Sequence, residues 1–318
     1  MNKKKLLIIP MLLSISLCAA ACSPPSSSEN GSKLKIVTTI FPQYDFARQI
    51  GRDKIDLQML VTPGGESHSY EPTPQDMIAV NGCDIFICSG GESDVWSNVI
   101  LNSVNTEGKT VIKLMDCVET VEEETADGMT EKPSLGRDEE ETEYDEHVWT
   151  SIKNAEKISK TISGAMCKAD SKNADFYSEN LNSFIDRLDA LDKKYEEAVS
   201  EAANKTLIFG DRFPFRYLFD DYGLEYCAAF PGCSTDSDVS AKNMLFLINK
   251  VRENNLNAVY YIEFSARKIA DTIAAETGAE PLLFHSCHTV SKADFENGVT
   301  YIELMTQNLE NLKRGLLN

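Results

Sequence analysis

Short apolar segments alternate with amphipathic segments along most of this 318-residue chain, beginning at Leu34. Thr73 marks the clearest helix start, because it can cap a helix, Pro74 suits the first helical position and Asp76 can reach back to the cap. Alternating strands and helices favour a parallel sheet with helices on its faces. In the first half, the predicted strands are 35–40, 55–61, 84–88 and 110–114, and the predicted helices are 44–50, 95–102 and one that begins at Thr73.

The second half repeats this alternation. A helix capped by Ser151 comes first, with an apolar face that includes Ile152, Ile158 and Ile162. No internal sequence repeat is strong enough to claim. The later predicted strands are 207–209, 258–262 and 281–284, and the later predicted helices are 215–222, 241–253, 268–277 and 300–316.

One apolar pattern is much longer than the others. From Tyr177 to Ala198 the apolar residues are spaced 4, 3, 4, 3, 4 and 3 apart, which predicts one helix from about 173 to 203. At ~1.5 Å per residue it would be roughly 45 Å long. This length favours a spine between two lobes. A self-associating coiled coil is the less favoured alternative, because the pattern stops after about four heptads.

Residues 118–146 interrupt the pattern. They contain thirteen acidic residues against only Lys132 and Arg137. Such a segment has almost nothing to bury, so it predicts an acidic loop. A solvated insertion without a function is the simplest interpretation. The alternative is that the segment, which lies immediately before His147, attracts cations.

The first residues indicate export. Three lysines precede an apolar run from Leu6 to Ala21, which is too short to span a membrane and is typical of a secretory signal at 1–21. The junction Ala19-Ala20-Ala21-Cys22 resembles the lipobox of bacterial lipoproteins. On this interpretation Cys22 is acylated and 22–33 is a flexible tether. Ordinary cleavage near Ala21, which would release a secreted protein, is the alternative.

Charge and cysteine content narrow the possibilities further. The net charge of −19 argues against nucleic acid and anionic lipid as partners and is compatible with attracting cations. Seven cysteines follow Cys22, and an odd number does not form a closed disulfide framework. Cys227 and Cys233 are the one local pair close enough to consider for a disulfide. Buried free thiols are expected otherwise.

The chain has four histidines, and all lie in loops or at strand ends of the predicted fold. His68 precedes the helix that Thr73 caps, His147 precedes the helix that Ser151 caps, and His285 ends the last predicted strand. His288 follows three residues later. Ligands gather at such loops in open α/β sheets, and neutral imidazole is a common ligand of zinc. We therefore expect these histidines to converge on one metal ion.

Two motifs resemble those of the zinc- and manganese-binding lipoproteins of bacterial ABC importers: His68-Ser-Tyr-Glu71-Pro-Thr-Pro-Gln-Asp76 and Asp145-Glu-His147-Val-Trp149. The resemblance runs from about Leu34 to the C-terminus. It implies an α/β fold of two lobes, each a mostly parallel four-stranded sheet flanked by helices, joined by one long rigid helix. The implied divisions are a metal-binding lobe at 34–168, a linking helix at 169–203 and a second lobe at 204–318.

The resemblance also implies a function. A protein of this kind is extracytoplasmic and held to the membrane only by its N-terminal lipid anchor. As a monomer, it captures a divalent ion between its lobes and passes it to a membrane permease and its ATPase subunit. It is not an enzyme. The same fold serving as a surface adhesin is a further alternative.

The resemblance transfers unevenly onto individual residues. His68 and His147 match the first two ligands. The third ligand position corresponds to Arg212, which cannot bind a cation, so Asp211 is a candidate substitute. The fourth falls on His285. His288 is expected to be either a further ligand or a support for His285, and Asp145 is expected to hold His147.

The donor types then indicate the metal. Three or four imidazoles favour Zn²⁺, whereas Mn²⁺, the alternative, prefers more oxygen ligands. Three histidines around an open position would also suit a secreted zinc hydrolase. Neither histidine segment has the His-Glu-x-x-His pattern of zinc proteases, and Asp211 and Glu263 are the only obvious candidates for a general base.

Overall fold

A computed structural model describes residues 33–91, 94–126, 128–129, 143–234 and 238–317. The expected signal segment 1–21, Cys22 and the tether 22–32 lie outside the described residues. Within the described part of the chain, no helix is both long enough and apolar enough to cross a membrane.

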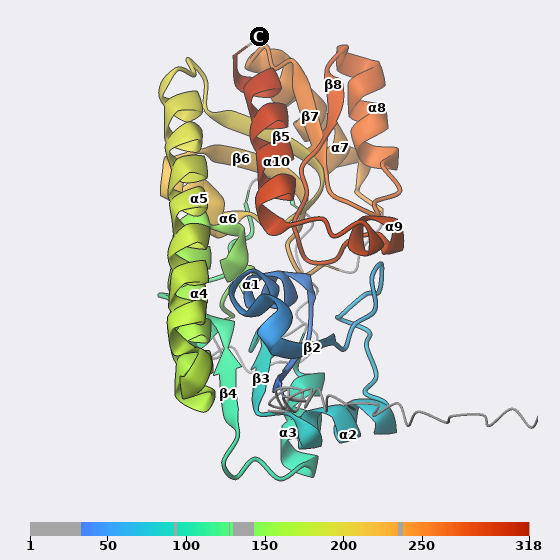
Figure 1. Ribbon diagram of the computed structural model, residues 1–318. Helices are drawn as coiled ribbons and strands as arrows, with labels where there is room; N and C mark the ends of the chain where they lie inside the picture. The colour runs from blue at the N-terminus through green and yellow to red at the C-terminus, as the bar shows by residue number, and fades with distance from the viewer. Residues whose placement is uncertain (1–32, 92–93, 127, 130–142, 235–237, 318) are drawn as a thin grey trace, which may run out of the picture. The chain divides into compact units, whose positions relative to one another are not determined.

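The first half forms a parallel four-stranded sheet in the order β2-β1-β3-β4 (Figure 1). All four strands lie where the sequence pattern predicts them. Thr73 caps α2, and its hydroxyl and the Asp76 side chain complete the expected capping box. The elements are β1 (Leu34–Thr38), α1 (Phe41–Gly51), β2 (Ile55–Met59), α2 (Pro74–Gly82), β3 (Ile85–Cys88), α3 (Trp96–Ser103), β4 (Thr110–Lys113) and α4 (Ile152–Ala169).

The second half forms another parallel four-stranded sheet, in the order β6-β5-β7-β8. The strand β6 (Glu225–Pro231) has no counterpart among the predicted strands. Its Cys-Ala-Ala run carries small side chains, which give little strand signal. The short helix α9 (Lys292–Glu296) is also additional. The other elements are β5 (Thr206–Phe213), α6 (Arg216–Tyr222), α7 (Ala241–Glu253), β7 (Ala258–Tyr261), α8 (Lys268–Thr277), β8 (Glu280–Leu283) and α10 (Tyr301–Leu316).

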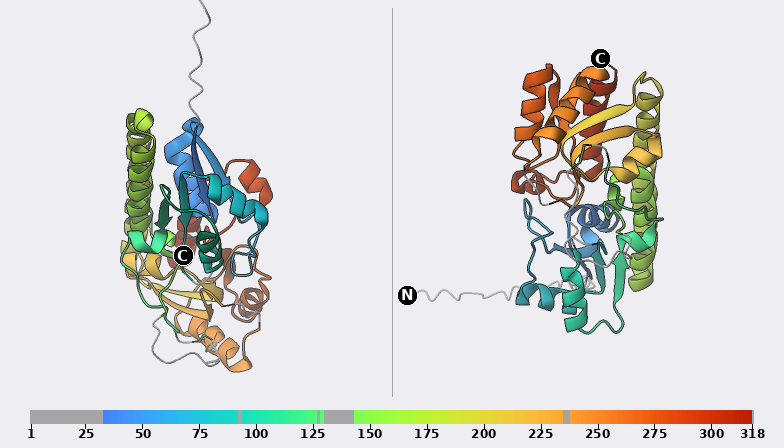
Figure 2. Two further views of the ribbon diagram at one scale, coloured as in Figure 1. Left: turned by 90° about the horizontal axis from the view of Figure 1, so that it is seen from below. Right: turned by 180° about the vertical axis from the view of Figure 1, so that it is seen from behind.

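The predicted long helix is present as α5 (Ala174–Ser200), with 27 residues and a length of ~40 Å (Figure 1 and the right-hand view of Figure 2). It packs against α1 and α4 of the first half and against α10 of the second half. Asn180 donates a hydrogen bond to the carbonyl of Ile50, and Tyr195 donates one to the carbonyl of Met305. The helix is therefore attached to both halves along its length.

Buried hydrogen bonds also join the two halves directly. The Trp149 indole donates to the carbonyl of Ser286 at 2.9 Å, and the Tyr301 hydroxyl donates to the carbonyl of Trp149 at 2.8 Å. The Tyr301 amide donates to the buried carboxylate of Asp45 at 2.7 Å. These contacts fix the segment after His147 against the loop that carries His288. Residues Lys33–Asn318 form one compact unit, and the divisions at 34–168, 169–203 and 204–318 stay predictions.

The ends of the acidic segment are held together. The amide of Glu123 donates to the carbonyl of Glu143 at 2.8 Å, and the amide of Asp145 donates to the carbonyl of Val121 at 2.9 Å. Most of the segment between them, 130–142, lies outside the described residues, so the cation-gathering alternative stays a prediction.

No disulfide joins cysteines of the described residues, so Cys227 and Cys233 are not paired with each other. Cys227 is buried in β6, whereas Cys233 lies beyond the end of that strand. Burial raises the pKa of Cys83 to about 11 and that of Cys88 to about 12, as expected for inert core thiols.

Candidate metal centre

Three of the four histidines line one small cavity. His68, His147 and His288 face a space of about 70 Å³ together with Arg212 and Glu263. The ring centroids of His68 and His288 lie 5.8 Å apart, and those of His147 and His288 lie 6.2 Å apart. Since about 10–15 Å³ of such space is enough for one water molecule, the cavity has room for an ion together with a few waters.

His68 presents one ring nitrogen to this region without a hydrogen-bond partner. Its Nδ1 lies 2.8 Å from Oε1 of Glu66, and this contact lowers the pKa of Glu66 to about 2. An ionised carboxylate can only accept, so Nδ1 carries the proton and Nε2 keeps its lone pair. Nε2 is buried, makes no hydrogen bond, and has Oε1 of Glu146 at 3.8 Å. A buried, unpartnered imidazole lone pair is what a metal ion requires.

His147 is held in the same way by Asp145. Its Nδ1 lies 2.9 Å from Oδ1 of Asp145, and its backbone amide donates to the same oxygen at 2.8 Å. Burial lowers the pKa of His147, but Asp145 and nearby acidic side chains overcome that effect and raise it. Tyr217 donates to the Asp145 carbonyl at 2.6 Å. Asp145 thus contacts His147 where a supporting carboxylate would lie, and its role stays a prediction.

His288 completes the group from the second half of the chain. Burial lowers its pKa, and His147 and His68 lower it further, so the ring is neutral at pH 7. Its Nε2 lies 2.6 Å from the Ser67 hydroxyl, and its ring lies 5.4 Å from that of Trp149. The preceding Cys287 adopts a left-handed conformation with φ of 61°, which turns the chain toward the cavity.

The structure does not bring His285 to this cavity. Its Nδ1 accepts a hydrogen bond from the Cys287 amide at 2.9 Å, which occupies the lone pair that a metal would need. Its backbone amide donates to the Asn308 side chain at 2.6 Å, and that side chain donates back to its carbonyl. His285 therefore holds the loop against α10, and the turn at Cys287 carries His288 into the cavity instead.

Arg212 occupies the third ligand position that the resemblance implies, as the sequence indicates. Arg212 lines the cavity, and its Nη1 lies 3.9 Å from Oε2 of Glu66. Asp211 does not line this cavity. Its Oδ1 accepts from the Arg212 amide and its Oδ2 from the Ile262 amide, which ties β5 to the segment after β7. Burial raises the pKa of Asp211. Both residues line a larger adjoining space of about 390 Å³.

Glu263 does not act as a free base at the site. Its Oε2 accepts from the Ser286 amide at 2.7 Å, and its Oε1 accepts from the Ser286 hydroxyl. Both oxygens therefore hold the loop that leads to His288.

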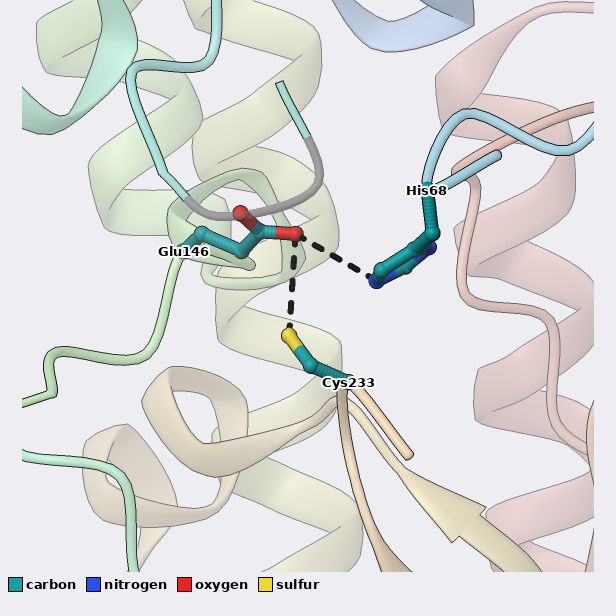
Figure 3. Close-up of side chains that lie close together, drawn as sticks. All are labelled: His68, Glu146 and Cys233. Atoms are coloured by element: carbon teal, nitrogen blue, oxygen red, sulfur yellow. Dashed lines mark hydrogen bonds and ion pairs between the residues drawn. The ribbon is translucent and has the colours of Figure 1, made fainter. Parts of the chain in front are cut away.

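Glu146 and Cys233 are site residues that the sequence did not single out. Figure 3 shows the Glu146 carboxylate directed toward the His68 ring and the Cys233 thiol directed toward that carboxylate, with the three residues coming from segments far apart in the sequence. The potential ligand atoms of these three residues all lie within 4.8 Å of one another. Glu146 reads as part of the acidic segment and Cys233 as a disulfide candidate, so neither has a local signal for this role. The side chain of Glu146 is only 1% exposed.

The comparisons with known proteins identify the family. Residues 36–315 match the family ZnuA, described as the periplasmic component A of a zinc-uptake complex. The chain belongs to the ZnuA family. The high-affinity zinc uptake system protein ZnuA of Bacillus subtilis is 32% identical over 98% of this chain and 96% of its own length. The zinc-binding lipoprotein AdcA of Streptococcus pneumoniae (TIGR4) is 29% identical over 95% of this chain, which spans 60% of that protein.

Solved structures show the same fold. The metal-dependent lipoprotein YcdH of Bacillus subtilis superposes with a TM-score of 0.76 and 30% identity, covering 90% of this chain and all of its own. The zinc-bound ZnuA-like domain of Streptococcus pneumoniae AdcA superposes with a TM-score of 0.73 and 26% identity, again covering 90% of this chain. The ZnuA-like fold of two four-stranded parallel sheets is therefore confirmed for this protein.

Proposed function

We propose that this protein captures a zinc ion between its two halves and delivers it to an ABC-type importer. The observation that carries the proposal is the buried, unpartnered Nε2 of His68 beside a 70 Å³ cavity that His147 and His288 also line. Membership of the ZnuA family supports the transport role, because the family description and the named relatives concern zinc uptake and zinc binding. They favour transport over the zinc hydrolase alternative.

The ligands that we propose are His68, His147 and His288, with Glu66 and Asp145 fixing the first two rings. Three neutral imidazoles suit Zn²⁺, which takes nitrogen donors in tetrahedral geometry. Mn²⁺ prefers oxygen donors and a higher coordination number, so it should bind more weakly here. His285 supports the loop in this proposal and does not bind the ion.

The cellular setting is also a proposal. The protein works outside the cytoplasm, and acylation at Cys22 anchors it to the membrane. Its partners are the permease and the ATPase subunit of the importer, and it acts as a monomer. The family's description as a periplasmic uptake component and the lipoprotein name of a relative support this setting.

Isothermal titration of metal-free protein lacking residues 1–21 tests the binding function. We expect one tight zinc site per chain, weaker binding of manganese, and loss of tight zinc binding in His68→Ala. His285→Ala serves as the matched control, because it removes an imidazole from the same region without removing a proposed ligand. An unmodified zinc affinity in His68→Ala would refute the site.

The delivery step needs a separate measurement. Cells that lack the gene should take up radioactive zinc slowly, and the wild-type gene should restore uptake. The His68→Ala gene should not. Restored uptake by a variant that cannot bind zinc would argue against delivery by this protein.

A further inference from the structure

The proposed histidine site leaves one coordination position open. Zinc takes four ligands in closed sites, and three imidazoles supply three of them. Arg212 lines the cavity where the resemblance implies a further ligand, and a guanidinium has no lone pair to offer. Another donor has to come from a different part of the fold if the site is closed.

A carboxylate and a thiol also lie close to the unpartnered nitrogen of His68. Oε1 of Glu146 lies 3.8 Å from Nε2 of His68, and Sγ of Cys233 lies 3.6 Å from the same carboxylate oxygen. The ligand atoms of the three residues lie within 4.8 Å of one another. In a tetrahedral site, Zn–S of ~2.3 Å and Zn–N of ~2.0 Å put sulfur and nitrogen about 3.5 Å apart. A small side-chain rotation would therefore place one ion against both.

The fold holds Cys233 at the histidine site. It follows the end of β6, where the Ser234 amide donates to the Pro231 carbonyl at 3.2 Å. The preceding Gly232 lines the histidine cavity. A Cβ atom at that glycine would lie 3.0 Å from Cε1 of His147, so the chain passes directly against this imidazole. The backbone thus brings the cysteine to the edge of the cavity that holds the other donors.

Glu146 is positioned just as tightly. Its carboxylate lies against Gly91, where an added Cβ would come within 2.1 Å of Oε2. The Glu146 side chain is only 1% exposed, so it fixes its neighbours in place. The Cys233 thiol already donates a hydrogen bond to it at 3.6 Å.

We propose that Cys233 provides a thiolate ligand to the zinc ion held by His68, His147 and His288, with its proton passing to the solvent as the ion binds, and that Glu146 holds the Cys233 side chain in position. This inference rests on the proposed zinc site and adds a fourth donor to it. A thiolate would make the site selective for thiophilic ions such as zinc, cadmium and cobalt over manganese.

Cobalt substitution tests the inference directly, because a cobalt–thiolate bond gives a charge-transfer absorption band in the near ultraviolet. Metal-free protein lacking residues 1–21 is loaded with Co²⁺ in the presence of a non-thiol reductant. We expect the band in the wild type and its loss in both Cys233→Ser and Cys233→Ala. The matched control is Cys167→Ser, which alters a half-buried thiol at the end of α4 and should keep the band.

Zinc affinity provides the second measurement. Cys233→Ser should bind zinc at least ~10-fold more weakly, with a smaller preference for cadmium over manganese. Glu146→Gln should keep the cobalt band, because it removes no proposed ligand, and should weaken zinc binding less than Cys233→Ser does.

The outcomes separate the two proposals. Tight zinc binding without a charge-transfer band, or a band that persists in Cys233→Ser, overturns the thiolate ligand and leaves the histidine site intact. Failure of the wild-type protein to bind zinc or cobalt overturns both. A band in the wild type that disappears only in the Cys233 variants supports both.

Discussion

The two sides of the candidate metal centre are built differently. On the side of the first sheet, His68 and His147 each have Nδ1 bound to a carboxylate two residues earlier in the chain, Glu66 and Asp145 respectively. On the side of the second sheet, no such local pair exists among the described residues. His288 reaches the cavity through a left-handed turn, and Cys233 comes from a different strand end.

The difference has a physical origin. A histidine with a carboxylate two residues away carries its own means of fixing the tautomer, so the local sequence is enough to prepare it as a ligand. The donors of the second side depend on contacts with distant residues. Ser67 contacts His288, and Asn308 holds the loop at His285. Substitutions on the first side should therefore lower zinc affinity most. Substitutions on the second side should lower both zinc affinity and the stability of the fold.

The largest difference in zinc affinity is expected between His147→Ala and His285→Ala. Loss of the proposed ligand should weaken zinc binding by more than ~100-fold, beyond the effect known for residues that only support a ligand. His285→Ala should weaken zinc binding by at most ~10-fold, the low end of the effect of a supporting residue, and lower the free energy of unfolding by about 1–3 kcal/mol, because the buried Cys287 amide loses its acceptor. Competition titration and chemical denaturation measure the two quantities. A large affinity loss in His285→Ala would restore it as a ligand.

The next largest difference in zinc affinity is expected between variants of two buried aspartates, Asp145 and Asp211. Asp145→Asn should weaken zinc binding by ~10–100-fold, since the amide no longer fixes the tautomer of His147. Asp211→Asn should leave zinc affinity unchanged, because this side chain binds two backbone amides and the Ser265 side chain and does not line the histidine cavity. Titration of both variants under identical conditions decides the matter. If Asp211→Asn were the weaker binder, Asp211 would have to contribute to the site.

The contribution of Asp94 to stability should depend on pH. This buried carboxylate does not hold a histidine. Burial raises its pKa from 3.8 to about 7, and Oδ1 of this residue is buried without a hydrogen bond. The folded state thus keeps this proton to a higher pH than the unfolded state does. Its contribution to stability is present below about pH 4 and is lost as the pH rises to about 7.

Asp94→Asn removes this titration. In metal-free protein, the variant should gain stability relative to the wild type between about pH 4 and pH 7, by on the order of 2 kcal/mol. Urea denaturation at a series of pH values measures it. A constant stability difference across this range would show that Asp94 does not titrate there.

The smallest effects concern the attachment of α5. Asn180→Ala removes a hydrogen bond to the first half, and Tyr195→Phe removes one to the second half. Each should cost about 1 kcal/mol of stability, since both bonds are buried. Thermal unfolding of the two variants measures this. Zinc affinity that fell in only one variant would show that the helix supports one side of the site more than the other.

Much of the fold could be predicted from the sequence because its signals are local. The capping box at Thr73, the cap at Ser151 and the regular apolar spacing of α5 all correspond to observed elements. The weak strand β6 lacked such a signal, since its small residues become a buried edge strand only when β5 pairs with it.

The sequence by itself determined the strands of the first sheet, the long helix and the pairing of His147 with Asp145, because each depends on residues within a few positions of one another. Only the tertiary structure decided which of His285 and His288 faces the cavity, since Asn308 and the turn at Cys287 make that choice. It also brought Glu146 and Cys233 to His68. No local pattern could predict that meeting, because it arises from where three separate segments end in the folded chain.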